Sequence, residues 1–190
     1  MPLTLEIPTR ELFDEKELRF FYSPRTVLKL EHSLISLSEW ESKWKRPYLV
    51  QPVLTEEANR KTLEEERDYI RCMTMNHNPV DPSVYKALSV EELNKIRTYI
   101  NDTMSATTVK ERPGQPPNRE IVTSEVIYAW MTILRIPFRP AETWHLNRLM
   151  KLIEVVSSKQ EPPKNMPRAE SMRRRHSINS ARRAAYMRRH

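Results

Sequence analysis

Histidine and cysteine are two of the residue types of this 190-residue chain that could bind a metal or carry catalysis. The chain has one cysteine, Cys72, and five histidines, His32, His77, His145, His176 and His190. None of them is spaced from another as in a metal-binding motif, and no HExxH or CxxC sequence occurs. His77 precedes Asp81 in a proline-rich stretch, where an ordinary loop histidine is the simpler interpretation. We therefore predict no catalytic residue, no metal and no cofactor.

Nucleophilic and phosphate-binding chemistry is disfavoured by the same composition. Gly114 is the only glycine, so neither a GxSxG turn nor a glycine-rich phosphate loop can be built. Cys72 lies in the apolar-leaning segment YIRCMTM, which favours an inert, buried thiol. The sequence therefore predicts that the protein is not an enzyme.

The densest mixture of aromatic and polar side chains is WHLNR at residues 144–148. On a helix, Trp144 and Arg148 lie one turn apart and can form a cation–π contact, while His145 and Asn147 point elsewhere. These residues either contact a partner or serve the fold. In the second case Trp144 packs beneath the preceding prolines, and Asn147 and Arg148 hydrogen-bond to neighbouring carbonyls.

Tryptophan supplies the other candidate partner contacts. Ser38 and Glu41 fit a capping box that begins a short helix and places Trp40 and Trp44 one turn apart. The two rings either close the core over a sheet or form an exposed aromatic anchor. The complete candidate partner-binding set is Trp40, Trp44, Trp130, Trp144, His145, Asn147 and Arg148.

Arginine is concentrated near the C-terminal end. Residues 161–190 contain nine Lys and Arg residues against two Glu, which accounts for the whole net charge of +7. The arginine clusters are Arg173, Arg174, Arg175, Arg182, Arg183, Arg188 and Arg189. On a helix they spread around the cylinder, which suits contact with nucleic-acid phosphates or an acidic protein, although a solubilising tail is the alternative. We interpret residues 161–190 as a basic arm, flexible or helical on binding.

Overall composition narrows the class of protein further. One Gly against 15 Pro favours short elements with stiff connectors and disfavours a large β fold. The single cysteine excludes an internal disulfide and indicates a reducing compartment. No run approaches the roughly 20 apolar residues of a membrane span, and the N-terminus lacks the pattern of a secretion signal. We expect no membrane association.

Alternating apolar residues predict a small antiparallel sheet in residues 1–34. The alternation runs through residues 3–8, 18–22 and 27–31, with FDEKE and YSPRT as turns, so three strands are expected. A sheet of this size needs a helix or a partner against its apolar face.

Helical patterns dominate residues 35–160. One helix is predicted from about Thr55 or Thr62 to Met75, with a possible capping box at Thr62–Glu65. A second capping box, at Ser89–Glu92, predicts a helix from about Val90 to Met104. Two further helices flank the break at Ile136–Pro140 and form a hairpin, and Thr123 or Ser124 is the expected N-cap of the first. Their apolar stripes contain Ile127, Trp130, Met131 and Leu134, then His145, Leu149, Leu152, Ile153 and Val156.

The predicted fold class is therefore α+β and mostly α-helical. It consists of a small N-terminal antiparallel sheet (residues 1–34), a helical body with a C-terminal helical hairpin (residues 35–160), and the basic arm (residues 161–190).

Several stretches together resemble one protein family. They are SLISLSEWESKWKRPYL, YIRCMTM, the block TSEVIYAWM…IPF…WHLNRLMKLI, and the NSARR of the tail. This combination resembles the tail assembly chaperones of tailed bacteriophages over most of residues 26–185, most strongly in 121–153. The resemblance implies a helical, non-enzymatic protein of the host cytoplasm, with possible self-association. It would bind the tape-measure protein and keep it soluble until the tail tube polymerises around it.

A chaperone of this kind needs grooves lined by adaptable side chains, because its client is long, helical and apolar along one stripe. Methionines lie on or beside the predicted apolar faces, although core packing is their commoner role: Met73, Met75, Met104, Met131 and Met150. Two other functions stay open, namely a structural virion protein of the neck, tail or head, and an accessory protein whose arm binds nucleic acid.

Overall fold

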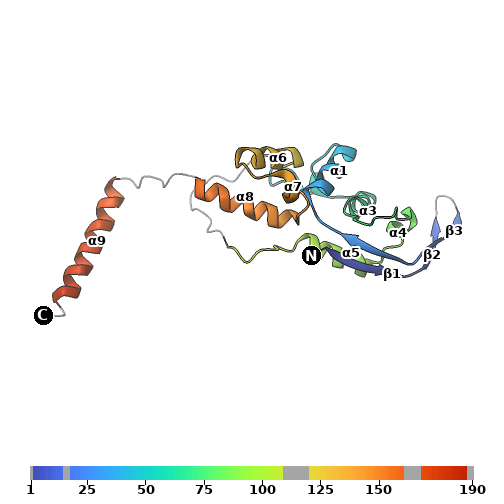
Figure 1. Ribbon diagram of the computed structural model, residues 1–190, viewed down its shortest axis with the longest axis horizontal. Coiled ribbons are helices and arrows are strands. Elements are labelled where there is room, and N and C mark those ends of the chain that lie inside the picture. The colour runs from blue at the N-terminus through green and yellow to red at the C-terminus, as the bar shows by residue number, and fades with distance from the viewer. Residues whose placement is uncertain (1, 15–17, 109–119, 161–167, 188–190) are drawn as a thin grey trace. The chain divides into compact units, whose positions relative to one another are not determined.

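The computed structural model describes residues 2–14, 18–108, 120–160 and 168–187 (Figure 1). The chain divides into two compact units, Met1–Ser157 and Ser158–His190. The first contains a small antiparallel sheet at its N-terminal end followed by helices, and this confirms the predicted α+β, mostly helical fold class. No helix within the described ranges combines the length and apolarity needed to cross a membrane.

The described strands form two antiparallel pairs. β1 (Leu3–Ile7) pairs with β4 (Thr26–Leu30), and β2 (Arg10–Asp14) pairs with β3 (Arg19–Ser23). The predicted three-stranded sheet is wrong, because residues 13 and 14 of the expected FDEKE turn belong to β2. The segment RELFD has no clear alternation of its own, and it becomes a strand by pairing with the aromatic residues of β3.

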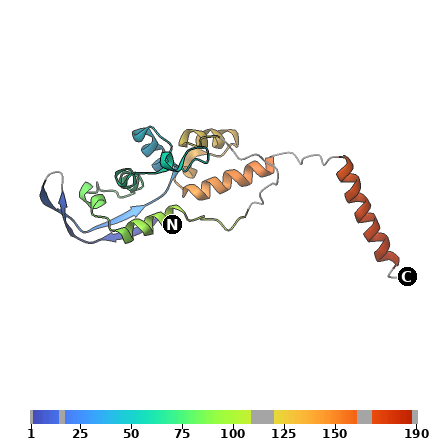
Figure 2. The same ribbon diagram turned by 180° about the vertical axis from the view of Figure 1, so that it is seen from behind.

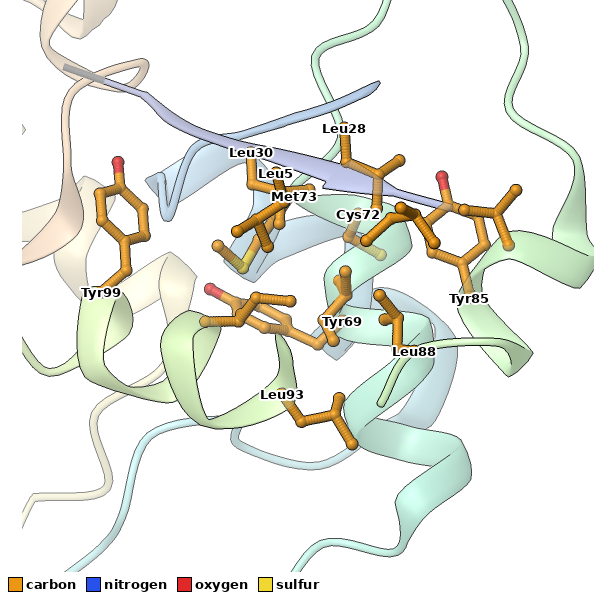
Figure 3. Close-up of a cluster of buried hydrophobic side chains, with 14 of the residues drawn as sticks. Leu5, Leu28, Leu30, Tyr69, Cys72, Met73, Tyr85, Leu88, Leu93 and Tyr99 are labelled. Atoms are coloured by element: carbon orange, nitrogen blue, oxygen red, sulfur yellow. The ribbon is translucent and has the colours of Figure 1, made fainter. Parts of the chain in front are cut away.

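One face of the β1–β4 pair forms the floor of the first apolar cluster. Leu5, Ile7, Leu28 and Leu30 alternate along their strands and are buried, since cross-strand partners share a face. They pack against α3 (Leu63–Cys72), α4 (Pro82–Lys86) and α5 (Val90–Ile100). Figure 3 shows strand and helix side chains converging in this cluster. The sheet and these helices therefore share one core.

Local capping sets the starts of α3 and α5. Thr62 with Glu65, and Ser89 with Glu92, each form both hydrogen bonds of a capping box, which confirms the two predicted boxes. A shorter helix, α2 (Glu56–Asn59), precedes α3. α5 ends at Ile100 and does not reach residue 104.

Helix α1 (Leu34–Trp44) begins earlier than predicted. Its N-cap is Ser33, so the proposed capping box at Ser38 is wrong. Glu41, the acidic member of that box, serves a tertiary role instead. Its carboxylate accepts hydrogen bonds from the backbone N–H groups of Tyr48 at 2.9 Å and Ser124 at 2.7 Å. The side chain therefore ties α1 to the first turn of α6.

Helices α6 (Ser124–Ile133), α7 (Phe138–Ala141) and α8 (Leu146–Gln160) surround the second apolar cluster. α1 contributes Leu34 and Leu37 to this cluster and Trp40 to the first, so it separates the two. Both views show α6 beside α1 (Figures 1 and 2). The helices flanking the predicted break are thus present, and both pack on α1.

Candidate partner-binding groove

An open groove of about 600 Å³ runs between α6 and α8. Its surface is mostly apolar, and Ile133 is 73% exposed to solvent. The lining residues are Asn101, Thr103, Trp130, Ile133, Leu134, Asn147, Met150, Lys151, Ile153, Glu154 and Ser157. The groove has the form of a binding site for an apolar segment of another molecule.

The groove exists because α6 is apolar on two sides. Ile127 and Met131 are fully buried in the second cluster. Trp130 and Leu134 are only partly buried, and Ile133 lies on the outer side. A helix that is apolar around most of its circumference needs a second covering surface. Trp130 is among the residues predicted from the sequence to contact a partner, and Met150 is among the methionines expected beside the apolar faces, but the sequence pattern does not identify Ile133 or Leu134 as wall residues.

Three polar side chains of the groove wall have partners within the protein. Asn147 donates hydrogen bonds from Nδ2 to the carbonyl oxygens of Ile100 at 2.8 Å and Asp102 at 2.7 Å. Lys151 and Glu154 form an ion pair of 2.6 Å. Asn147 thus joins α8 to the end of α5, as the structural interpretation of WHLNR proposed.

The other residues of WHLNR lie outside the groove. The guanidinium carbon of Arg148 lies 4.8 Å from the ring centroid of Trp144, which confirms the predicted cation–π contact. His145 is buried; its Nε2 lies 3.1 Å from the carbonyl oxygen of Tyr99, and its ring meets the Tyr99 ring edge-on. A partner cannot reach His145, so its assignment as a contact residue is corrected.

The tryptophan pair belongs mainly to the core. Trp40 is fully buried and donates from Nε1 to the carbonyl oxygen of Glu65 at 2.9 Å. Trp44 is partly buried, donates to Asp68 at 2.8 Å, and stacks on Trp40 with ring centroids 6.1 Å apart. The core interpretation holds for Trp40, which is not an exposed anchor. These two rings lie apart from the groove residues.

A buried polar cluster links the two apolar clusters. His32 Nδ1 lies 2.5 Å from the hydroxyl of Tyr69, and the rings of His32 and His145 are 5.2 Å apart. Burial, reinforced by His145, lowers the pKa of His32 to about 3. Burial raises the pKa of Tyr69 well above its ordinary value. Both groups are uncharged at neutral pH, and they support the fold at this junction.

The cysteine thiol and the potential metal ligands are expected from the sequence to be inert. Burial raises the pKa of Cys72 to about 12, so almost no thiolate forms at neutral pH. No group of three or more His, Cys, Asp or Glu residues able to hold a metal occurs in the part of the chain that the structure describes.

A second exposed apolar surface lies on the β2–β3 hairpin. This hairpin face consists of Phe13, Leu18, Phe20 and Tyr22, with exposures from 49% to 77%. Phe13 and Phe20 are register partners with ring centroids 5.0 Å apart. The other side of the hairpin is anchored, because Arg10 forms a bidentate pair with Glu92 at 2.7 and 2.9 Å. In both views the hairpin lies at the end of the body away from α6 and α8 (Figures 1 and 2).

The second unit contains α9 (Arg168–Met187). Four of the predicted basic residues are described with exposed side chains: Arg173, Arg175, Arg182 and Arg183. The side chain of Arg174 and the residues Arg188 and Arg189 lie outside the described part of the chain.

Comparison with known proteins found no match to this chain. No protein-family model matches the chain, and neither a curated protein nor a solved structure matches it.

Proposed function

We propose that this protein is a non-enzymatic tail assembly chaperone of a tailed bacteriophage, acting in the host cytoplasm on the tape-measure protein. The observation that carries the proposal is the open apolar groove between α6 and α8, with Ile133 exposed. The assignment to this family rests on the resemblance of the sequence segments. The groove supports the binding role that the resemblance implies.

The groove suits one face of an amphipathic helix. Helix-in-groove recognition uses apolar anchors at positions i, i+3, i+4 and i+7 of the bound helix, and a long helical tape-measure chain repeats such anchors. Met150 has a flexible side chain that adapts to anchors of different shape. Full burial of the Ile133 side chain is worth about 1.5–3 kcal/mol, so it can contribute roughly tenfold or more in affinity.

The hairpin face offers a separate apolar contact at the other end of the body. When one client chain binds both surfaces, the overall affinity exceeds that of either contact alone, because the second binding event becomes intramolecular. A long client with repeated apolar anchors can use both surfaces of one molecule or coat itself with many molecules.

The test is co-expression of the protein with the tape-measure protein of the same phage. We expect the tape-measure protein to stay in the soluble fraction and to co-purify with the chain. Ile133→Asp places a charge in the groove and should reduce co-purification at least tenfold. Val90→Asp is the matched control, because Val90 is 71% exposed at the first position of α5, where a negative charge is tolerated.

Two results would contradict the proposal. The first is equal solubility of the tape-measure protein with and without the chain. The second is recovery of the chain from purified virions in stoichiometric amounts, which would instead favour a structural protein of the neck, tail or head.

A further inference from the structure

Helix α9 has a composition unlike that of the body. Its 20 residues contain six arginines, no lysine and one glutamate. Arginine presents a planar, permanently charged fork that bonds a phosphate through two parallel N–H groups, whereas lysine acts as a point charge. A concentration of arginine alone therefore indicates recognition of phosphates or carboxylates, beyond a general positive charge.

The arrangement of these arginines disfavours a flat binding surface. Successive residues of an α-helix are about 100° apart, so Arg173 and Arg175 point about 160° apart and Arg182 and Arg183 about 100° apart. The side chains of all four are exposed. A planar partner meets only one side of a helix and would leave part of this charge unused. A groove with charged walls on both sides can meet all of it.

Insertion into a bilayer is disfavoured by the same arrangement. Ile178 and Tyr186 are exposed apolar side chains of α9. Arg175 and Arg182 lie three or four residues from them, and these spacings put all four on the same side of the helix. An interfacial membrane helix keeps its cations on the face opposite its apolar side chains.

We propose that α9 lies in the major groove of double-stranded DNA and binds the phosphates on both walls without reading the base sequence. The major groove is about 12 Å wide and admits an α-helix of 10–12 Å diameter. A 20-residue helix is about 30 Å long, close to the length of one duplex turn. Contacts to phosphates position a protein but carry no sequence information.

The test measures binding of the full chain to a fluorescently labelled 20-base-pair DNA duplex by anisotropy across a range of NaCl concentrations. If six arginines each neutralise one phosphate, log Kobs falls with log [NaCl] with a slope of about −5.4. Affinity then drops about 10³-fold between 50 and 200 mM salt. AT-rich and GC-rich duplexes should bind within a few-fold of each other.

The variant carries Arg173→Gln, Arg175→Gln, Arg182→Gln and Arg183→Gln. Glutamine is a good helix former, so α9 is retained while the slope becomes shallower by up to about 3.6. The matched control removes four exposed cations of the body through Lys29→Gln, Lys45→Gln, Lys95→Gln and Arg135→Gln. It should keep the wild-type slope, and circular dichroism confirms that both variants are folded.

Three results would overturn the proposal. The arginine variant could bind DNA with the wild-type slope, or the body variant could lose as much binding. Polyglutamate could compete as well as duplex DNA per unit charge, which would indicate an acidic protein partner. Double-stranded RNA could bind equally well, which would contradict the major-groove placement, because the A-form major groove is deep and narrow.

Discussion

Mild acid should destabilise this protein through His32. The side chain is 1% exposed, faces the Tyr69 hydroxyl and lies beside His145. Its pKa is lowered from an ordinary 6.5 to about 3, mainly by burial. The unfolded chain therefore binds a proton near pH 6.5, whereas the folded chain keeps a neutral imidazole. Stability is complete above pH 6.5 and falls as the pH is lowered toward 3.

The magnitude follows from the two pKa values. A single histidine with these values costs about 2 kcal/mol between pH 7 and pH 5. With a urea dependence of about 2 kcal/mol per molar, the midpoint of unfolding should fall by about 1 M over this interval. A loss of this size is a large fraction of the stability of an ordinary domain.

Urea unfolding followed by tryptophan fluorescence at pH 7, 6 and 5 measures this effect. His32→Gln keeps a polar group near Tyr69 but cannot titrate, so most of the 2 kcal/mol dependence should disappear. His77→Gln is the control, because His77 is an exposed histidine of the same unit. The reasoning is refuted if His32→Gln retains the full loss between pH 7 and pH 5.

Two further predictions concern buried groups. Glu41→Ala should destabilise the protein by about 2–4 kcal/mol, because two backbone N–H groups, of Tyr48 and Ser124, lose their acceptor. Glu41→Gln should cost less than the alanine variant, since one oxygen remains; equal urea midpoints for the two variants would contradict this account. Cys72 should react with iodoacetamide at pH 8 at least about 10³-fold more slowly than a free thiol, because a pKa near 12 leaves about one thiolate in ten thousand. Mass spectrometry before and after addition of urea measures this, and modification at the rate of free cysteine in native buffer would disprove it.

Local sequence rules succeeded where the deciding contacts are close in the chain. The capping boxes of α3 and α5 join residues three positions apart, so the pattern contains both partners. The same rule failed at Ser38, because Glu41 bonds instead to residues 48 and 124. A pattern of four residues holds no information about such distant N–H donors.

The candidate groove could be predicted only in part. Trp130 was identified from its type and from the apolar face on which it lies. Ile133 was not, because its exposure depends on how α6 and α8 pack on Leu34 and Leu37 of α1. The apolar circumference of α6 was the available signal, since one buried face cannot account for it.

The sequence by itself determined the mostly helical class, the position of the break before α8, and the excess of arginine in the C-terminal arm. These properties depend on periodicity, proline and composition, which are local or additive. Only the tertiary structure decided that Trp40 and His145 are buried while Ile133 and the hairpin face are exposed. Exposure depends on which distant segments pack together. Residues of the same type and spacing can therefore be buried in one place and exposed in another.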